Sequence, residues 1–230
     1  MTRLDFHNQE LLDYMSMLYR ACPPSVYQPT NTDKPEKYDE KTYISRNFFL
    51  TRETAKIITE KGVLLDLGSS ISPQGSFLLY KNIISSLICI DKGRLQLENV
   101  KTLLTVLKAK NPVNPIYSSF TSYSYIPLSR NSCDYIISFD FLFREFLDPT
   151  ISNMVLNDCY RVLKKRGKIF IVVYFEKEQQ PTVKPTSIRP ATEIMSLGLT
   201  GARMNLLRVG EHKLKGIDGR FDFVLGSKQH

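Results

Sequence analysis

The sequence has 230 residues and a net charge of +8, and 42% of its residues are hydrophobic. No apolar stretch is long enough to span a membrane, no signal-peptide core opens the chain, and the four cysteines are too widely spaced for a zinc site. These features predict a reduced, intracellular protein, cytoplasmic or nuclear, with one globular domain, a short extension and no bound metal or membrane partner.

The first 60 residues predict a helical cap and a linker. Apolar residues at spacings of three and four predict a helix over 8–19. The proline-rich stretch 22–41 has no periodicity and predicts a linker or an adaptable loop. A second helix is predicted at about 51–61. The remaining residues, 61–230, are expected to form the main domain.

Strands and helices alternate after Gly62. Apolar runs predict strands at 63–68, 86–91, 115–120, 133–140 and 168–175, and amphipathic segments predict helices at 73–82, 93–110 and 149–165. This alternation predicts a doubly wound parallel sheet with helices on both faces. After a helix at 191–198, two strand-like segments at 202–210 and 220–228 predict an antiparallel hairpin at the edge of that sheet.

The first strand runs into a turn with few glycines, "LLDLGSSISPQGS" (64–76). Gly68 allows a tight turn, and Ser72 is a candidate N-cap for the helix that begins near Pro73. The next strand ends in Asp91, whose carboxylate can accept two hydrogen bonds from ribose hydroxyls. Because ligands bind beyond the carboxyl ends of such strands, the sequence predicts a nucleoside site here.

Four segments, in this order and spacing, resemble the class I S-adenosylmethionine-dependent methyltransferases: "VLLDLGSS", "LICIDKG", "CDYIISFDFLF" and "CYRVLKKRGKIFIVVYF". The closing hairpin that ends "FDFVLGSK" is also similar to the last two strands of that fold. The resemblance covers residues 60–228. It implies a mostly parallel seven-stranded sheet, S-adenosylmethionine as the cofactor, and methyl transfer as the activity.

The resemblance also implies roles for single residues. The first motif and its loop would meet the methionine end of the cofactor, the second strand end would hold the ribose and adenine, and the fourth strand end would lie beside the methyl group. The first motif and its loop contribute Asp66, Gly68, Ser69 and Ser70. The end of the second strand contributes Asp91 and Lys92, and the end of the fourth strand contributes Ser138, Phe139 and Asp140. Ser122 takes the position of an acid that contacts the adenine amine.

The sequence departs from the family pattern and leaves alternatives open. Serines stand where glycines are usual in the first loop, and an acid is missing at Ser122. An inactive methyltransferase-like scaffold or partner subunit is therefore the main alternative. A nicotinamide-dependent oxidoreductase is disfavoured, because no G-x-x-G follows Gly68. Asp140 is either a general base or a structural partner of Arg144.

The positive charge favours RNA, or an RNA–protein assembly, as the acceptor or partner. Two groups of basic residues bear on this prediction. The run Lys164, Lys165, Arg166 and Lys168 is interpreted first as complementing a helix dipole and second as a nucleic-acid patch. The loop cations Lys177, Lys184 and Arg189 are expected near the mouth of the cleft.

Overall fold

Seven strands form one sheet in the order β3-β2-β1-β4-β5-β7-β6. The computed structural model describes residues 8–21, 39–69, 72–91, 94–107, 113–117, 125–141, 149–176, 191–214 and 219–229. The strands are β1 (Val63–Leu67), β2 (Ser86–Asp91), β3 (Val113–Tyr117), β4 (Cys133–Phe139), β5 (Leu163–Glu176), β6 (Met204–Lys213) and β7 (Gly219–Lys228). Strands β1 to β5 are parallel, whereas β7 runs antiparallel to both β5 and β6. The predicted fold class is confirmed.

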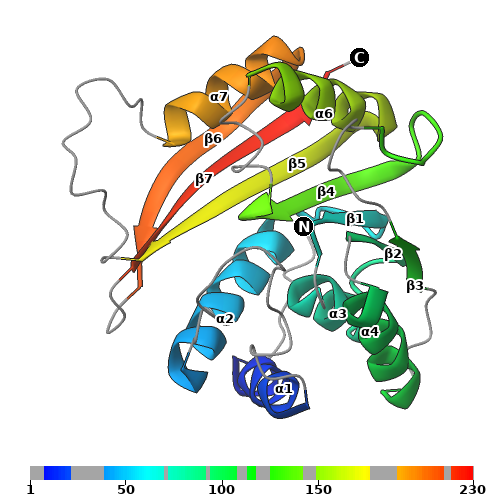
Figure 1. Cartoon of the computed structure of the whole chain (residues 1–230), viewed down its shortest axis with the longest axis vertical. Coiled ribbons are helices and arrows are strands. Elements are labelled where there is room, and N and C mark those ends of the chain that lie inside the picture. Colours follow the sequence, from blue (N-terminus) through cyan, green and yellow to red (C-terminus); the bar gives the residue numbers. More distant parts are fainter. Residues whose placement is uncertain are drawn as a thin grey trace.

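Helices cover both faces of the sheet (Figure 1). The helices are α1 (Asn8–Ala21), α2 (Glu40–Ile57), α3 (Pro73–Tyr80), α4 (Arg94–Val106), α6 (Pro149–Val162) and α7 (Ala191–Gly201). The first four lie on one face, and α6 and α7 lie on the other. Among the described helices, none has the length and hydrophobicity that a membrane span requires.

Helix α2 starts eleven residues before the predicted start at 51, so that prediction is wrong at its N-terminal end. The structural reason is an N-cap: the Asp39 carboxylate accepts a hydrogen bond from the Thr42 backbone N–H at 2.7 Å. The early turns bury Tyr43 and Leu50. At the other end, the Lys168 ammonium donates to the Ile57 carbonyl at 2.8 Å, which satisfies a free helix-end acceptor.

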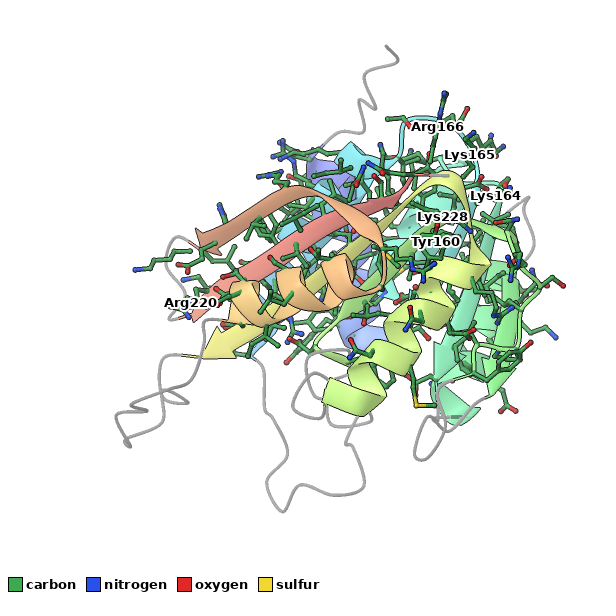
Figure 2. All side chains as sticks on the ribbon, turned by 90° about the horizontal axis from the view of Figure 1, so that it is seen from above. Tyr160, Lys164, Lys165, Arg166, Arg220 and Lys228 are labelled. Atoms are coloured by element: carbon green, nitrogen blue, oxygen red, sulfur yellow. The ribbon has the colours of Figure 1, made fainter. Side chains whose placement is uncertain are left out.

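Helix α6 ends at Val162, and β5 begins at the next residue. The predicted helix to 165 and the interpretation of Lys164–Lys168 as its last turn are therefore wrong. A residue from β7 caps this helix instead. The Lys228 ammonium donates to the Tyr160 carbonyl at 2.9 Å, the Leu163 carbonyl at 2.8 Å and the Asn131 Oδ1 at 2.8 Å. Figure 2 shows Lys228 beside Tyr160, below Lys164, Lys165 and Arg166 at the start of β5.

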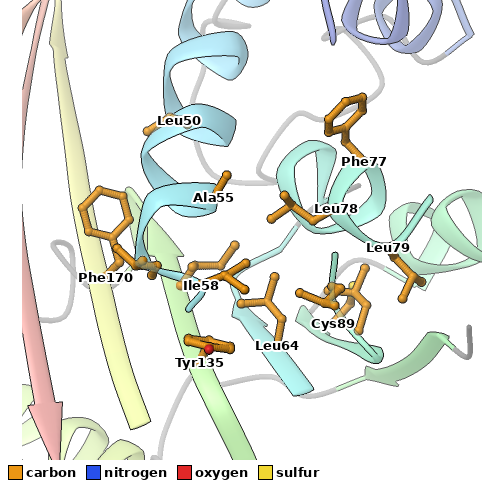
Figure 3. Close-up of a cluster of buried hydrophobic side chains, with 14 of the residues drawn as sticks. Leu50, Ala55, Ile58, Leu64, Phe77, Leu78, Leu79, Cys89, Tyr135 and Phe170 are labelled. Carbon is orange, nitrogen blue, oxygen red and sulfur yellow. The ribbon is translucent and has the colours of Figure 1, made fainter. Parts of the chain in front are cut away.

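Two hydrophobic clusters, one on each face, hold the layers together. The first joins α1 to α4 to the sheet, and Figure 3 shows Leu50 and Ala55 of α2 facing Leu78 of α3 and Phe170 of β5. The second joins α6 and α7 to the opposite face. Because α1 and α2 are part of the first cluster, they share a core with the sheet, and the division of the chain at residue 60 stays a prediction.

Candidate functional site

The predicted nucleoside site lies where the strand order reverses. The chain leaves β1 for β2 and β3 on one side and returns to β4 and β5 on the other. Ligands of doubly wound sheets bind beyond the carboxyl ends of strands at such a point. Here β1 is followed by Gly68, β2 ends at Asp91, and β4 is followed by Asp140. The structure thus brings most of the predicted residues to one edge of the sheet.

The turn after β1 depends on Gly68. Its φ of 69° lies in the left-handed region, which favours glycine. The backbone N–H groups of Gly68 and Ser69 donate to the Ile90 carbonyl at 2.9 and 3.3 Å, which ties the loop to β2. A Cβ at position 68 would lie 2.4 Å from the Cβ of Phe141. Phe141, which the sequence analysis did not single out, therefore packs directly over this glycine.

Asp66 faces the interior and bonds within the loop. Its side chain is buried, and its Oδ2 accepts a hydrogen bond from the Ser72 hydroxyl at 2.5 Å. Burial raises the pKa of Asp66 to about 7; the Ser72 bond opposes this rise, and the charge of Asp91 adds to it. The contact of Asp66 with a cofactor stays a prediction.

Ser72 occupies the N-cap position of α3, as predicted, but its side chain does not cap the helix. The hydroxyl is used by Asp66 instead. Ser72 has a φ of 46°, a left-handed conformation that is costly for a residue with a Cβ. The bond to Asp66 offsets that cost, which explains how a serine is accommodated where the family pattern has glycine.

The Ser69 hydroxyl has no ordinary hydrogen-bond partner among the described residues. Its side chain is buried, and its hydroxyl makes no hydrogen bond of ordinary geometry with any described residue, although it approaches the Cys89 thiol. Buried hydroxyls are normally hydrogen-bonded, so an orphaned one beside a loop of this kind is consistent with a ligand contact. Cys89 itself is fully buried on β2, and burial raises the pKa of its thiol.

The other predicted residues differ in exposure. Asp91 is half-buried at the end of β2, in register with Tyr117 of β3. Ser138 is fully buried and its hydroxyl donates to the Leu67 carbonyl at 3.3 Å. The Phe139 ring packs edge-to-face on Phe170, with centroids 6.2 Å apart. Of these three residues, Asp91 is the one with a charged group at the edge of the sheet.

Asp140 is joined to the N-terminal cap. Its Oδ2 forms an ion pair with Arg46 of α2, and its Oδ1 accepts from the Tyr174 backbone N–H at 2.7 Å. The Arg46 guanidinium also lies 5.1 Å from the centroid of the Tyr174 ring. Asp140 has a φ of 62°. The arrangement links α2, β4 and β5 beside the candidate site.

Some predicted residues fall outside the described residues: Ser70, Lys92, Ser122, Arg144, Lys177, Lys184 and Arg189. Conversely, Arg46 and Phe141 were missed. The N-cap signal at Asp39 would have extended the predicted helix to include Arg46. No group of His, Cys, Asp and Glu side chains within the described ranges is arranged to hold a metal ion.

The strand order, with an antiparallel β7 between β5 and β6, is that of the class I S-adenosylmethionine-dependent methyltransferases, and comparison with solved structures agrees. No family model matches the sequence, and no curated protein matches it significantly. The strand order and the likeness to solved structures show that the chain has the methyltransferase fold, although its sequence identity to those proteins is low.

Three solved structures illustrate the likeness. An S-adenosylmethionine-dependent methyltransferase from Methanosarcina mazei is 17% identical, with 77% of this chain and 97% of that chain covered and a TM-score of 0.57. The 4+2 cyclase SpnF is 14% identical, with 96% and 94% covered and a TM-score of 0.64. A putative methyltransferase from Haloferax volcanii, in complex with its activator Trm112, is 14% identical, with 83% and 93% covered and a TM-score of 0.60. At these identities the likeness establishes the fold alone.

Proposed function

We propose that this protein binds S-adenosylmethionine at the carboxyl ends of β1 and β2 and transfers its methyl group to an acceptor. The observation that carries the proposal is the position of Asp66, Gly68 and Asp91 on adjacent strand ends where the sheet order reverses. The orphaned Ser69 hydroxyl also fits a polar ligand at this edge. The cofactor supplies an electrophilic methyl group on a sulfonium.

The protein's own residues would mainly bind and orient. Asp91 would accept hydrogen bonds from the ribose hydroxyls, and Ser69 would meet a polar group of the cofactor. Asp66 would act through Ser72, because their hydrogen bond fixes the turn that leads into α3. Methyl transfer is an in-line displacement, so holding the two reactants in line and excluding water accounts for much of the rate.

Asp140 is better suited to positioning than to proton abstraction. Both of its carboxylate oxygens already accept a bond from the protein, one from Arg46 and one from the Tyr174 N–H. A general base needs an oxygen within reach of the proton that it removes. We therefore infer that Asp140 and Arg46 fix α2 against the sheet beside the acceptor. The charge of +8 supports an RNA acceptor.

Isothermal titration tests cofactor binding. We expect S-adenosylmethionine and its demethylated product each to release or absorb heat and to raise the melting temperature, because a ligand that binds the native state stabilises it. The absence of both effects at millimolar ligand would contradict the proposal.

The variant Asp91→Ala tests the position of the ribose site. We expect it to weaken cofactor binding by about 1.5–3 kcal/mol for each charge-assisted hydrogen bond lost. Asp13→Ala on the exposed face of α1 is the matched control and should bind as the parent does. An Asp91→Ala variant with parental affinity would place the cofactor elsewhere.

A second candidate function is that of an inactive, methyltransferase-like partner subunit. Its support is Phe141, which occupies the space beside Gly68, and the serine at position 72. The complex of the Haloferax volcanii putative methyltransferase with its activator is an example of this fold with a protein partner. Transfer of a labelled methyl group to total RNA, to protein or to metabolite extracts separates the two. Cofactor binding without transfer to any of them would favour the subunit.

A further inference from the structure

Four exposed cations lie at the edge of the sheet opposite the candidate site. They are Arg130, Lys165, Arg166 and Arg203. Arg130 precedes β4. Lys165 and Arg166 lie in the irregular start of β5, between Leu163, which is in register with Cys133, and Lys168, which is in register with Tyr135. The Ser132 N–H donates to the Val162 carbonyl and so joins the two strand starts. Arg203 directly precedes Met204 of β6, which pairs with Lys228. Figure 2 shows Lys165 and Arg166 beside Lys228 and far from Arg220.

These cations are not neutralised within the described part of the chain. None of the four side chains forms an ion pair or hydrogen bond with another described residue. The nearby acid Asp134 is already paired with Lys164, at 2.8 Å. Burial, followed by the charge of Arg130, lowers the pKa of Lys228, so Arg130 and Lys228 are close enough to repel each other. The edge therefore has a local excess of positive charge.

The helix dipole does not account for these cations. Lys228 already binds the carbonyls at the end of α6, and Lys165 and Arg166 lie beyond the helix, in the irregular start of β5. Arg166 has a φ of 63°, and Asn131, next to Arg130, has a φ of 57°. The turn at Arg130 and the irregular start of β5 thus project cations outward, where they stabilise no described element.

An exposed aromatic ring lies at the same end of α6. The Tyr125 side chain is 64% exposed, and the Arg161 guanidinium lies 4.5 Å from its ring centroid. Arg161 is held in place by Asp158 and by the carbonyls of Ile126 and Leu128. Its own carbonyl accepts from the Asn131 N–H, next to Arg130. Tyr125 is therefore fixed on one face and offers the other beside the cations.

We propose that this edge, formed by Arg130, Lys165, Arg166, Arg203 and Tyr125, is a docking surface for single-stranded RNA. Separated cations contact successive phosphates, and an exposed ring stacks on an unpaired base. The exposed ring favours RNA over an acidic protein or an anionic membrane, neither of which has a base to stack. Because a strand rises about 3.3 Å per residue, the seven residues of β4 place this surface roughly 20 Å from the candidate site. The surface adds a binding region to the proposed function, but the proposal of an RNA surface does not depend on that function.

Fluorescence anisotropy with a labelled oligouridine, measured over a salt series, tests the surface. In the variant Arg130→Gln/Lys165→Gln/Arg166→Gln we expect weaker binding. The salt slope, which is the slope of log affinity against log salt concentration, should decrease in magnitude by about 2, or about 0.7 for each of three phosphate contacts. The control is Arg20→Gln/Lys41→Gln/Lys101→Gln, which removes the same charge from exposed positions on α1, α2 and α4. Its salt slope should stay at the parental value.

The variant Tyr125→Ala provides an independent test. We expect about a tenfold loss of affinity with an unchanged salt slope, because stacking does not depend on counterion release. Equal losses in the two triple variants, no oligouridine binding, or binding to anionic vesicles or poly-glutamate but not to RNA would each overturn the proposal. S-adenosylmethionine titration of the first triple variant should give the parental affinity, so failure of the RNA surface is distinguishable from failure of the proposed function.

Discussion

Asp66→Asn is expected to abolish a loss of stability that we also expect in the parent protein as the pH rises from 5 to 8. Burial raises the pKa of Asp66 from 3.8 in the unfolded chain to about 7 in the folded protein. The native state therefore holds a proton that the unfolded state has released. Stability from this group is fully present below pH 3.8 and is lost as the pH rises through about 7.

The expected size follows from linkage. Each pH unit between pH 5 and the folded pKa of about 7 lowers the free energy of unfolding by about 1.4 kcal/mol, and little changes above that pKa. The parent should therefore lose about 2–3 kcal/mol between pH 5 and pH 8 through Asp66. The asparagine variant keeps an acceptor for the Ser72 hydroxyl and does not titrate. Urea unfolding at both pH values measures the difference.

Asp13→Asn, an exposed carboxylate on α1, is the control and should leave the pH dependence unchanged. Other titrating groups contribute equally to the parent and to the variant, so the difference between the two curves isolates Asp66. Identical slopes for parent and Asp66→Asn would show that Asp66 is ionised in the folded protein at neutral pH.

Lys228→Met is expected to lower the free energy of unfolding by about 2–3 kcal/mol. The substitution keeps much of the volume of a buried side chain but removes the donor for the Tyr160 carbonyl, the Leu163 carbonyl and the Asn131 amide oxygen. An acceptor left without a partner costs about 1–3 kcal/mol, and the relief of burying one charge fewer offsets part of the total.

The control for Lys228 is Lys165→Met at the nearby start of β5. Lys165 is exposed, so its substitution should change stability by no more than about 0.5 kcal/mol. Urea unfolding at one pH compares the two. Equal effects would mean that the end of α6 does not depend on the Lys228 ammonium.

Local sequence determined the sheet and the edge where the candidate site lies. The apolar runs at β1, β2 and β4, the helical periodicity between them and the hairpin at the C-terminus each depend on side chains close together in the chain. The turn glycine Gly68 and the strand-end acid Asp91 can likewise be recognised from the residues next to them in the sequence. Such features can be predicted because strand alternation, helix spacing and turn geometry are local.

Contacts between distant residues decided the rest. Arg46 reaches Asp140, 94 residues away, and Lys228 reaches Leu163, 65 residues away. The end of α6, the packing of Phe141 on Gly68 and the burial that raises the pKa of Asp66 likewise depend on which segments the folded chain brings together. The sequence pattern by itself does not specify these pairs, because cap donors, ion-pair partners and desolvation come from whichever elements pack nearby. The strand ends that form the site were therefore determined locally, whereas the protonation of Asp66, the partner of Asp140 and the exposure of the cations beside α6 were decided by tertiary packing.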